Sequence, residues 1–128
     1  MNREIGSEFW LTKIPTENVK GTPDWINTWG NNVLTSSGRG AVALMLNHVE
    51  NNIVSKTVLL PAYICESVIV PFIKEGYTCY FYDVDNNLKP NIESIKKHVK
   101  SEIGIFLHMG YFGFPTNDNL HDCISYFK

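Results

Sequence analysis

From about residue 30 onward, nearly continuous apolar stretches alternate with stretches that repeat an apolar position every three or four residues. Three of the continuous stretches, KTVLLPAY, TCYFYDVD and EIGIFLHM, are rich in β-branched and aromatic residues. This composition is typical of strands that are covered on both faces. A shorter strand is indicated by NNVLTSS. We therefore predict four strands, near residues 31–36, 56–62, 78–84 and 103–109.

Helices are predicted between and after these strands, over residues 38–52, 65–76, 92–100 and 119–128. In the first of them, one face at helical spacing is made of Ala41, Leu44, Met45, His48 and Val49. Gly76 is expected to end the second helix, and Pro71 inside it predicts a kink or a restart. Asn91 is expected to cap the third helix.

Strands that alternate with helices over short connections predict an α/β fold. We expect a three-layer αβα arrangement, with a mostly parallel sheet and right-handed crossovers, over residues 31–128. The sheet is expected to have an unfinished edge that favours self-association. Residues 1–30 form a separate N-terminal arm that carries Trp10, Trp25 and Trp29. Such an aromatic segment is expected to pack on this domain or on a partner chain.

Composition narrows the class of protein. The chain has 128 residues, 44% of them hydrophobic, and a net charge of -2, which argues against general nucleic-acid binding. Neither a membrane-spanning run nor a signal-peptide pattern is visible, so we expect a cytoplasmic protein with no membrane partner. The three cysteines include no CxxC pair, which disfavours disulfides and zinc. Cys79 and Cys123 are expected to be buried or half-buried.

In an open α/β sheet, ligands bind beyond the carboxyl ends of the strands, and four segments are predicted there. The first, SSGRGA, enters a helix whose first N–H groups have no intrahelical partner. Ser37 and the segment Gly38–Arg39–Gly40 suit a phosphate, because the glycines leave room for an anion. The alternative is a helix start that is simply capped by a serine. The fingerprints GxxxxGK[ST] and GxGxxG are both absent.

The other three segments are PAYICES, DVDNN and HMGYFGFPTN. Tyr63 or Cys65 in the first can face a ligand, although a plain strand-to-helix turn explains both residues. Asp83 and Asp85 lack the spacing of a calcium loop, so we expect a solvated strand end and no metal site. His108 stands where a ligand would be met.

Taken together, several segments resemble the large domain of fold-type-I, pyridoxal-phosphate-dependent aminotransferases. The resemblance is to the nucleotide-sugar (DegT/StrS-like) group. It rests on five short matches that occur in the order and spacing of that group. They are Ser37-Gly38 with Ala41; Pro61; Gly76 with Tyr80 or Phe81; Asp83-Val84-Asp85; and Gly113-Phe114-Pro115. It spans the chain from about Val33 onward and implies an incomplete version of that larger domain.

The resemblance also implies a function. Ser37, Gly38, Arg39 and Gly40 would hold the 5′-phosphate of pyridoxal phosphate, and the substrate would be a keto sugar linked to a nucleotide. Cys65 stands where the family places an aromatic ring over the cofactor, so Tyr63 or Tyr111 would have to replace it. None of the nine lysines matches the family's Schiff-base lysine, and the aspartate that pairs with the pyridine nitrogen is also absent.

We therefore expect a chain that is inactive alone, forms a homodimer, and has its N-terminal arm near the dimer interface. Two alternatives from other classes stay open. One is a non-catalytic α/β module that binds a phosphate or a nucleotide at Gly38–Gly40. The other is a structural interaction domain without a ligand.

Overall fold

The computed structural model describes residues 33–98, 101–113 and 120–127, and the chain from Leu34 onward forms one unit. Its elements, in chain order, are helix α2 (Gly38–Val49), 3₁₀ helix η1 (Glu50–Asn52), strand β1 (Thr57–Pro61), helix α3 (Glu66–Lys74), strand β2 (Thr78–Tyr82), helix α4 (Ile92–Lys96), strand β3 (Ile105–Phe106), 3₁₀ helix η2 (Tyr111–Gly113) and helix α5 (Leu120–Ser125). The predicted N-terminal arm, residues 1–30, lies outside the described residues.

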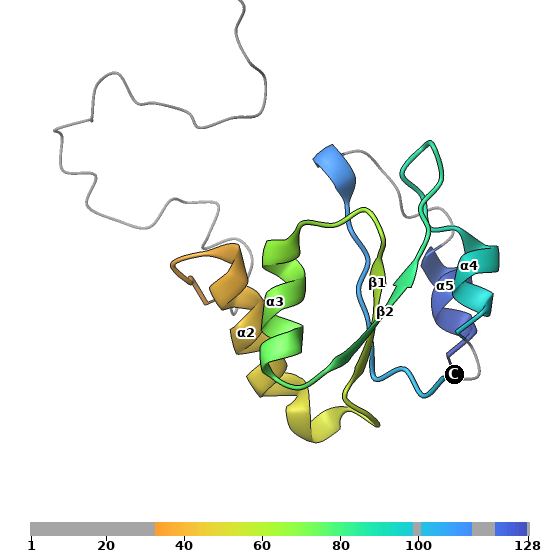
Figure 1. Ribbon diagram of the computed structural model, residues 1–128. Coiled ribbons are helices and arrows are strands. Elements are labelled where there is room, and N and C mark those ends of the chain that lie inside the picture. Colours follow the sequence, from red (N-terminus) through yellow and green to blue (C-terminus); the bar gives the residue numbers. More distant parts are fainter. Residues whose placement is uncertain (1–32, 99–100, 114–119, 128) are drawn as a thin grey trace, which may run out of the picture. The chain divides into compact units, whose positions relative to one another are not determined.

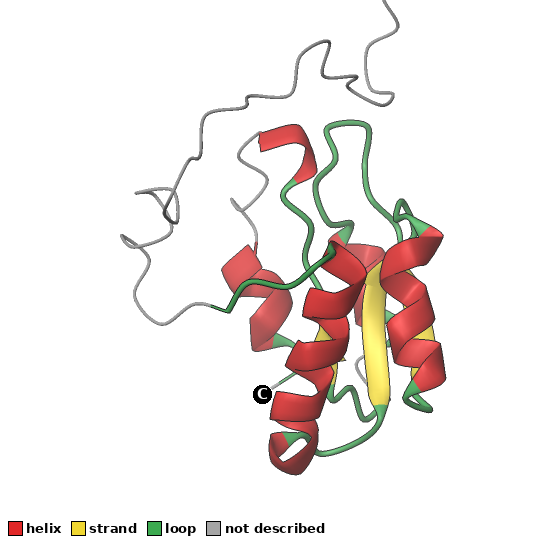
Figure 2. Cartoon of the chain, turned by 90° about the vertical axis from the view of Figure 1, so that its left-hand side faces the viewer, coloured by secondary structure: helices red, strands yellow, loops and turns green. Residues whose placement is uncertain are grey.

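The three strands form a parallel sheet in the order β2-β1-β3 (Figure 1). In the register of this sheet, Leu59 of β1 lies opposite both Tyr80 of β2 and Phe106 of β3. Helices α2 and α3 cover one face of the sheet, while α4 and α5 cover the other (Figures 1 and 2). The prediction of an α/β fold with a parallel sheet between two helical layers is confirmed.

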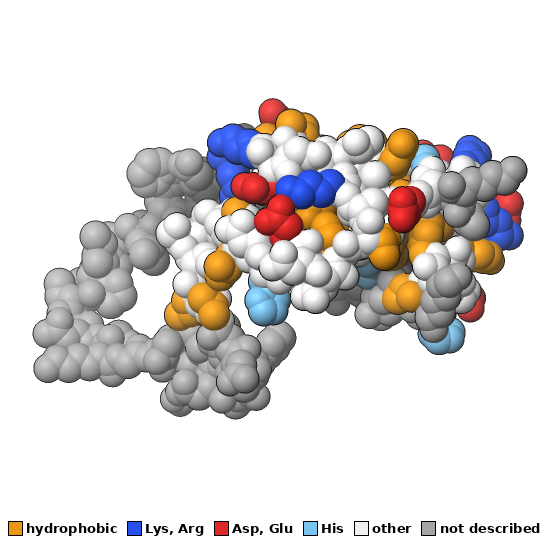
Figure 3. Space-filling view, turned by 90° about the horizontal axis from the view of Figure 1, so that it is seen from below, with side chains coloured by type: hydrophobic (Ala, Val, Ile, Leu, Met, Phe, Trp, Pro, Cys, Tyr) orange, Lys and Arg blue, Asp and Glu red, His pale blue; other side chains and the backbone are white. Residues whose placement is uncertain are grey.

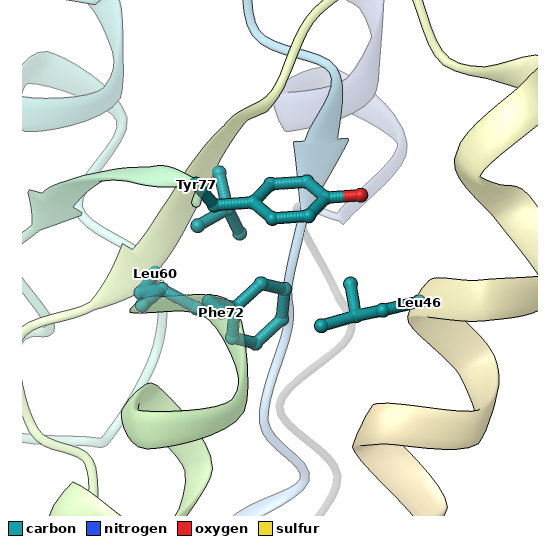
Figure 4. Close-up of a cluster of buried hydrophobic side chains, with 5 residues drawn as sticks. Leu46, Leu60, Phe72 and Tyr77 are labelled. Atoms are coloured by element: carbon teal, nitrogen blue, oxygen red, sulfur yellow. The ribbon is translucent and has the colours of Figure 1, made fainter. Parts of the chain in front are cut away.

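Strand β1 lies at the centre of the core. Its residues Val58, Leu59 and Leu60 are fully buried, because successive side chains point into opposite helical layers. On one side Val58 and Leu60 pack with Leu46, Phe72 and Tyr77 (Figure 4). On the other side Leu59 packs with Tyr82, Ile95 and Cys123. Cys123 is buried and Cys79 is half-buried, as predicted, and Cys65 is exposed.

Helix α3 ends, and helix α4 begins, at the residues that the sequence predicted. After α3, Gly76 adopts a left-handed conformation (φ 79°), and its N–H donates to the Ile73 carbonyl. The N–H of Tyr77 donates to the Phe72 carbonyl, which completes a Schellman motif. The N–H of Ser94 donates to Asn91 Oδ1 at 3.1 Å, so the predicted cap of α4 is confirmed. Of the two outcomes predicted for Pro71, a kink or a restart, the restart does not occur, because α3 continues through this residue.

The first predicted strand is wrong for the residues that can be checked, since residues 33–36 form no strand. Val33 and Leu34 are 75% and 62% exposed. A strand needs a neighbour for its backbone groups, and the three strands of the described chain pair only with one another. The last predicted strand is shorter than expected and is reduced to Ile105–Phe106.

The face of α2 that was noted at helical spacing is not the face that the fold buries. Leu46 is buried, Val42 packs beside it, and Val49 is half-buried. Ala41, Leu44, Met45 and His48 are exposed instead. Both sets repeat at helical spacing, so α2 carries two adjacent apolar stripes, and only the packing against α3 and β1 decides which one is covered.

Candidate functional site

Helix α2 begins at the carboxyl end of the sheet with two backbone donors available. Ser37 is its N-cap, and Ser37 Oγ accepts a hydrogen bond from the N–H of Gly40 at 3.1 Å. Within the described residues, no hydrogen bond uses the N–H of Gly38 or of Arg39. A Cβ atom added to Gly38 would meet nothing within 4 Å. Two N–H groups at the positive end of the helix dipole therefore have no hydrogen-bond partner among the described residues.

These donors open into a cavity of about 610 Å³. Three segments that are far apart in the sequence line it: Ser37, Gly38, Arg39 and Val42 from the start of α2, Ser67 and Val68 from α3, and Leu107, His108 and Met109 after β3. A cavity of this volume lies within the usual range for small-molecule sites. The structure thus brings SSGRGA, the turn after β1 and the segment after β3 together, and His108 is one of the lining residues.

A second cavity, of about 320 Å³, is lined by Tyr63, Ile64, Cys65, Met109 and Tyr111, so it shares Met109 with the first. The Tyr63 and Tyr111 rings lie 5.5 Å apart, and Tyr111 Oη donates to the Tyr63 carbonyl at 2.6 Å. Burial raises the pKa of the Tyr111 phenol, which keeps it a neutral donor in this bond. Both tyrosines considered from the sequence therefore line one aromatic pocket beside the α2 cavity.

Cys65 is the N-cap residue of α3, so neither Glu66 nor Ser67 occupies that position. Ser67 Oγ donates to Cys65 Sγ at 3.1 Å. This hydrogen bond lowers the pKa of the Cys65 thiol, and the positive charge of Arg39 acts in the same direction. The thiol is exposed at the edge of the aromatic pocket.

Arg39 lines both a cavity and a groove. It lines the 610 Å³ cavity, and it also lines a groove of about 320 Å³ between α2 and α3, together with Lys74 and Glu75. No ion pair of Arg39 is present in the part of the chain that the structure describes. Its guanidinium is therefore a positive charge at the mouth of the site.

The acidic turn after β2 is structural. Asp85 Oδ1 accepts hydrogen bonds from the N–H groups of Asn87 and Lys89, at 2.8 and 2.9 Å, and thereby closes the turn. Neither Asp83 nor Asp85 lines the cavities described above. Among residues 33–98, 101–113 and 120–127, no three His, Cys, Asp or Glu side chains are grouped to hold a metal ion.

Met109 and Val68 are lining residues that the sequence did not single out. Both are apolar residues in apolar runs, and only the fold brings them to the cavity. No residue pattern would have identified them without the strand order.

Charged side chains of both signs are mixed on the face drawn in Figure 3. Lys and Arg side chains lie there beside Asp and Glu side chains, so the coloured atoms form no patch of a single sign. Among the described residues, Lys56 Nζ and Glu50 Oε1 form an ion pair at 2.7 Å. No helix within the described ranges is long and apolar enough to cross a membrane. No protein-family model, curated protein or solved structure matches the chain.

Proposed function

We propose that this chain is the front portion of a pyridoxal-phosphate-dependent aminotransferase of the nucleotide-sugar group, which acts on nucleotide-linked keto sugars as a homodimer. Its three-stranded sheet is then the first part of a larger fold-type-I domain. The observation that carries the proposal is the opening of the α2 N-terminus into a cavity shared by three distant segments.

The start of α2 fits a phosphate group. The N–H groups of Gly38 and Arg39 supply two donors, and Gly38 leaves the space that an oxygen needs. The Gly40 N–H is already bonded to Ser37 Oγ, so it contributes to the helix cap rather than to the anion. Arg39 adds a positive charge at the same place. Two such bonds at an exposed site, with the charge of Arg39 beside them, are consistent with roughly millimolar affinity.

The neighbouring pocket fits an aromatic ring. Tyr63 and Tyr111 provide apolar ring surface where Cys65 cannot stack, and Met109 connects this pocket to the phosphate site. When bound, the pyridine ring supplies an electron sink for the reacting carbon. None of the nine lysines matches the family's cofactor lysine. The chain is therefore proposed to bind the cofactor reversibly and to catalyse no transamination alone.

The test is a titration with pyridoxine 5′-phosphate, which has no aldehyde and cannot react with surface lysines. Amide NMR shifts at Gly38 and Arg39 are expected to saturate at roughly millimolar ligand. Gly38→Val fills the open space and is expected to abolish these shifts. Asn47→Val, an exposed change later in α2, is the control and is expected to leave them intact. Shifts that map elsewhere, or that persist in Gly38→Val, contradict the proposal.

The phosphate- or nucleotide-binding module remains the second candidate, because the two N–H donors at α2 do not require a pyridine ring. Inorganic phosphate and uridine 5′-phosphate distinguish the two functions. Binding of pyridoxine 5′-phosphate that is tighter than both, with shifts at Tyr63 and Tyr111, supports the cofactor. Equal binding of all three supports the general phosphate module. Absence of binding by any of them supports the interaction domain.

A further inference from the structure

The groove of about 320 Å³ between helices α2 and α3 has no role in the function proposed above, and we call it the α2–α3 groove. The two helices lie side by side on one face of the sheet (Figures 1 and 2). The α2 side of the groove includes Arg39, Gly40 and Ala43, and the α3 side includes Pro71, Lys74 and Glu75. Gly40 and Ala43 are small residues, so the donors that a ligand meets here come chiefly from the longer charged side chains.

Two cationic side chains line this groove without an anionic partner among the described residues. The ion pairs of those residues involve Lys56 and Lys96, and neither Arg39 nor Lys74 takes part in one. Lysines in the last turn of a helix often donate to its final carbonyls, as Lys74 could on α3. No such bond of Lys74 Nζ is present in the described ranges. Both cations are therefore available to a ligand.

One carboxylate, that of Glu75, also lines the groove. Neighbouring residues of a helix point in different directions, and Glu75 forms no ion pair with Lys74 or with Arg39 in the part of the chain that the structure describes. Two positive charges thus face one negative charge, and the net charge of the lining is positive. The negative end of the α3 dipole also opposes an anion here, so the affinity of this groove for an anion is modest.

The groove is continuous with the cavity at the start of α2, because Ser37 and Arg39 line both. A guanidinium has five N–H donors in a planar fork, so Arg39 can bond oxygens of two different groups at once. A group that is joined to a phosphate in the cavity can therefore continue past Arg39 toward Lys74.

This continuity decides the chemistry of the ligand. The second anionic group must be joined directly to the first, since the same arginine lies beside both. A diphosphate has this form, because a single oxygen joins its two anionic phosphorus centres. An acidic peptide carries its carboxylates on separate side chains, and planar carboxylates make poorer use of the open space at Gly38 than a phosphate does.

From these observations we propose that the α2–α3 groove holds a second phosphate group. The chain then binds a diphosphate, with one phosphate at the start of α2 and the other between Arg39 and Lys74. This inference rests on the phosphate site proposed above, but not on the pyridine ring. Pyridoxal phosphate has a single phosphate, so a diphosphate is a second class of ligand that competes with it for the start of α2.

The test compares inorganic phosphate with pyrophosphate by amide NMR titration of the full chain. Low salt is used, because ions screen exposed charges. Pyrophosphate is expected to bind about tenfold more tightly than phosphate. Both anions are expected to shift Gly38, and only pyrophosphate is expected to shift Lys74 as well. Equal affinities, or pyrophosphate shifts that do not reach Lys74, overturn the proposal.

Three variants assign the effect to the groove. Lys74→Gln is expected to weaken pyrophosphate binding about fivefold and to leave phosphate binding unchanged. Lys97→Gln is the matched control, because it removes the same charge from the end of α4, on the opposite face of the sheet. Glu75→Gln removes the opposing carboxylate and is expected to strengthen pyrophosphate binding about twofold. Equal losses in Lys74→Gln and Lys97→Gln, or weaker binding in Glu75→Gln, overturn the proposal.

The outcomes separate this inference from the phosphate site on which it rests. If phosphate shifts Gly38 and pyrophosphate adds neither affinity nor a shift at Lys74, the second subsite alone is wrong. If neither anion shifts Gly38, the site at the start of α2 is wrong and the diphosphate proposal is overturned with it. Displacement of pyridoxine 5′-phosphate by pyrophosphate, at lower concentration than by phosphate, supports the shared site.

Discussion

The two ends of the parallel sheet differ in how completely their polar groups are bonded. At the amino end, the N–H of Gly104 donates to both the Thr57 carbonyl and Thr57 Oγ1, each at 3.1 Å. Ser55 Oγ lies 2.6 Å from Thr57 Oγ1, and Thr57 Oγ1 also donates to the Glu102 carbonyl. At the carboxyl end, residues at the starts of α2 and α3 line cavities instead, and the N–H groups of Gly38 and Arg39 have no hydrogen-bond partner among the described residues.

The comparison shows which end of the sheet stabilises this small domain and which end has backbone donors available for a ligand. The closed hydrogen-bond network at one end holds β1 and β3 in register. Unbonded donors at the other end have no such role, and a ligand can use them without breaking a contact. Two glycines express the contrast. A Cβ at Gly104 would lie 2.0 Å from the Ser55 carbonyl oxygen, whereas a Cβ at Gly38 would meet nothing within 4 Å.

The largest expected effect comes from the same substitution at these two glycines. Gly104→Ala is expected to lower the free energy of unfolding by about 2–4 kcal/mol, because backbone atoms of Ser55 must move. Gly38→Ala is expected to raise it by about 0.5 kcal/mol, since alanine restricts the unfolded chain. Urea denaturation followed by circular dichroism measures both. Equal changes in the free energy of unfolding for the two variants would contradict the difference between the two ends of the sheet.

A smaller effect is expected at the cap of α2. Ser37→Ala removes the acceptor of the Gly40 N–H and is expected to lower the free energy of unfolding by about 1 kcal/mol. Ser36→Ala is the control, because Ser36 is exposed and does not cap the helix. Thermal unfolding of the two variants side by side gives the difference. A Ser37→Ala variant as stable as Ser36→Ala would mean that this end contributes nothing to stability.

The smallest effect concerns reactivity rather than stability. Because the Ser67 hydrogen bond lowers the pKa of Cys65, the thiolate forms at lower pH than in an ordinary cysteine. Ser67→Ala is expected to move the pH profile of Cys65 alkylation to higher pH and to slow the reaction at neutral pH. Ser125→Ala is the control, because Ser125 lies on α5. Peptide mass spectrometry after timed iodoacetamide treatment follows the modification, and superimposable profiles would show that Ser67 does not act on the thiol.

Part of this structure was predictable because local signals were sufficient. Strand β1 coincides with the apolar run that begins near Lys56, since a strand covered on both faces needs no polar positions. Strand β2 coincides with the run that begins near Thr78, although Thr78 and Phe81 are exposed at this edge of the sheet. Gly76 and Asn91 act through their own backbone and side chain, so helix ends near them follow from residue type alone. Ser37 was expected at a helix start for the same reason.

The remainder depends on contacts that no local pattern specifies. Leu46 and Leu44 are equally apolar, and only the neighbouring α3 makes one of them the inward residue. In the sequence, nothing distinguishes Gly104 from the rest of its apolar run. Its close approach to Ser55 depends on the pairing of β3 with β1. Met109 enters the site for a similar reason, since the strand order brings its segment beside α2 and α3.

The central position of β1 has a consequence for the order in which the domain assembles. β1, α3 and β2 follow one another along the chain, so pairing β1 with β2 closes only a short loop. β3 reaches the opposite side of β1 from farther along the chain and contributes only two residues of pairing. Early folding is therefore expected to centre on the β1–α3–β2 unit, with β3 docking last. Opening of the native domain is expected to begin at β3, where amide hydrogens should exchange with solvent first.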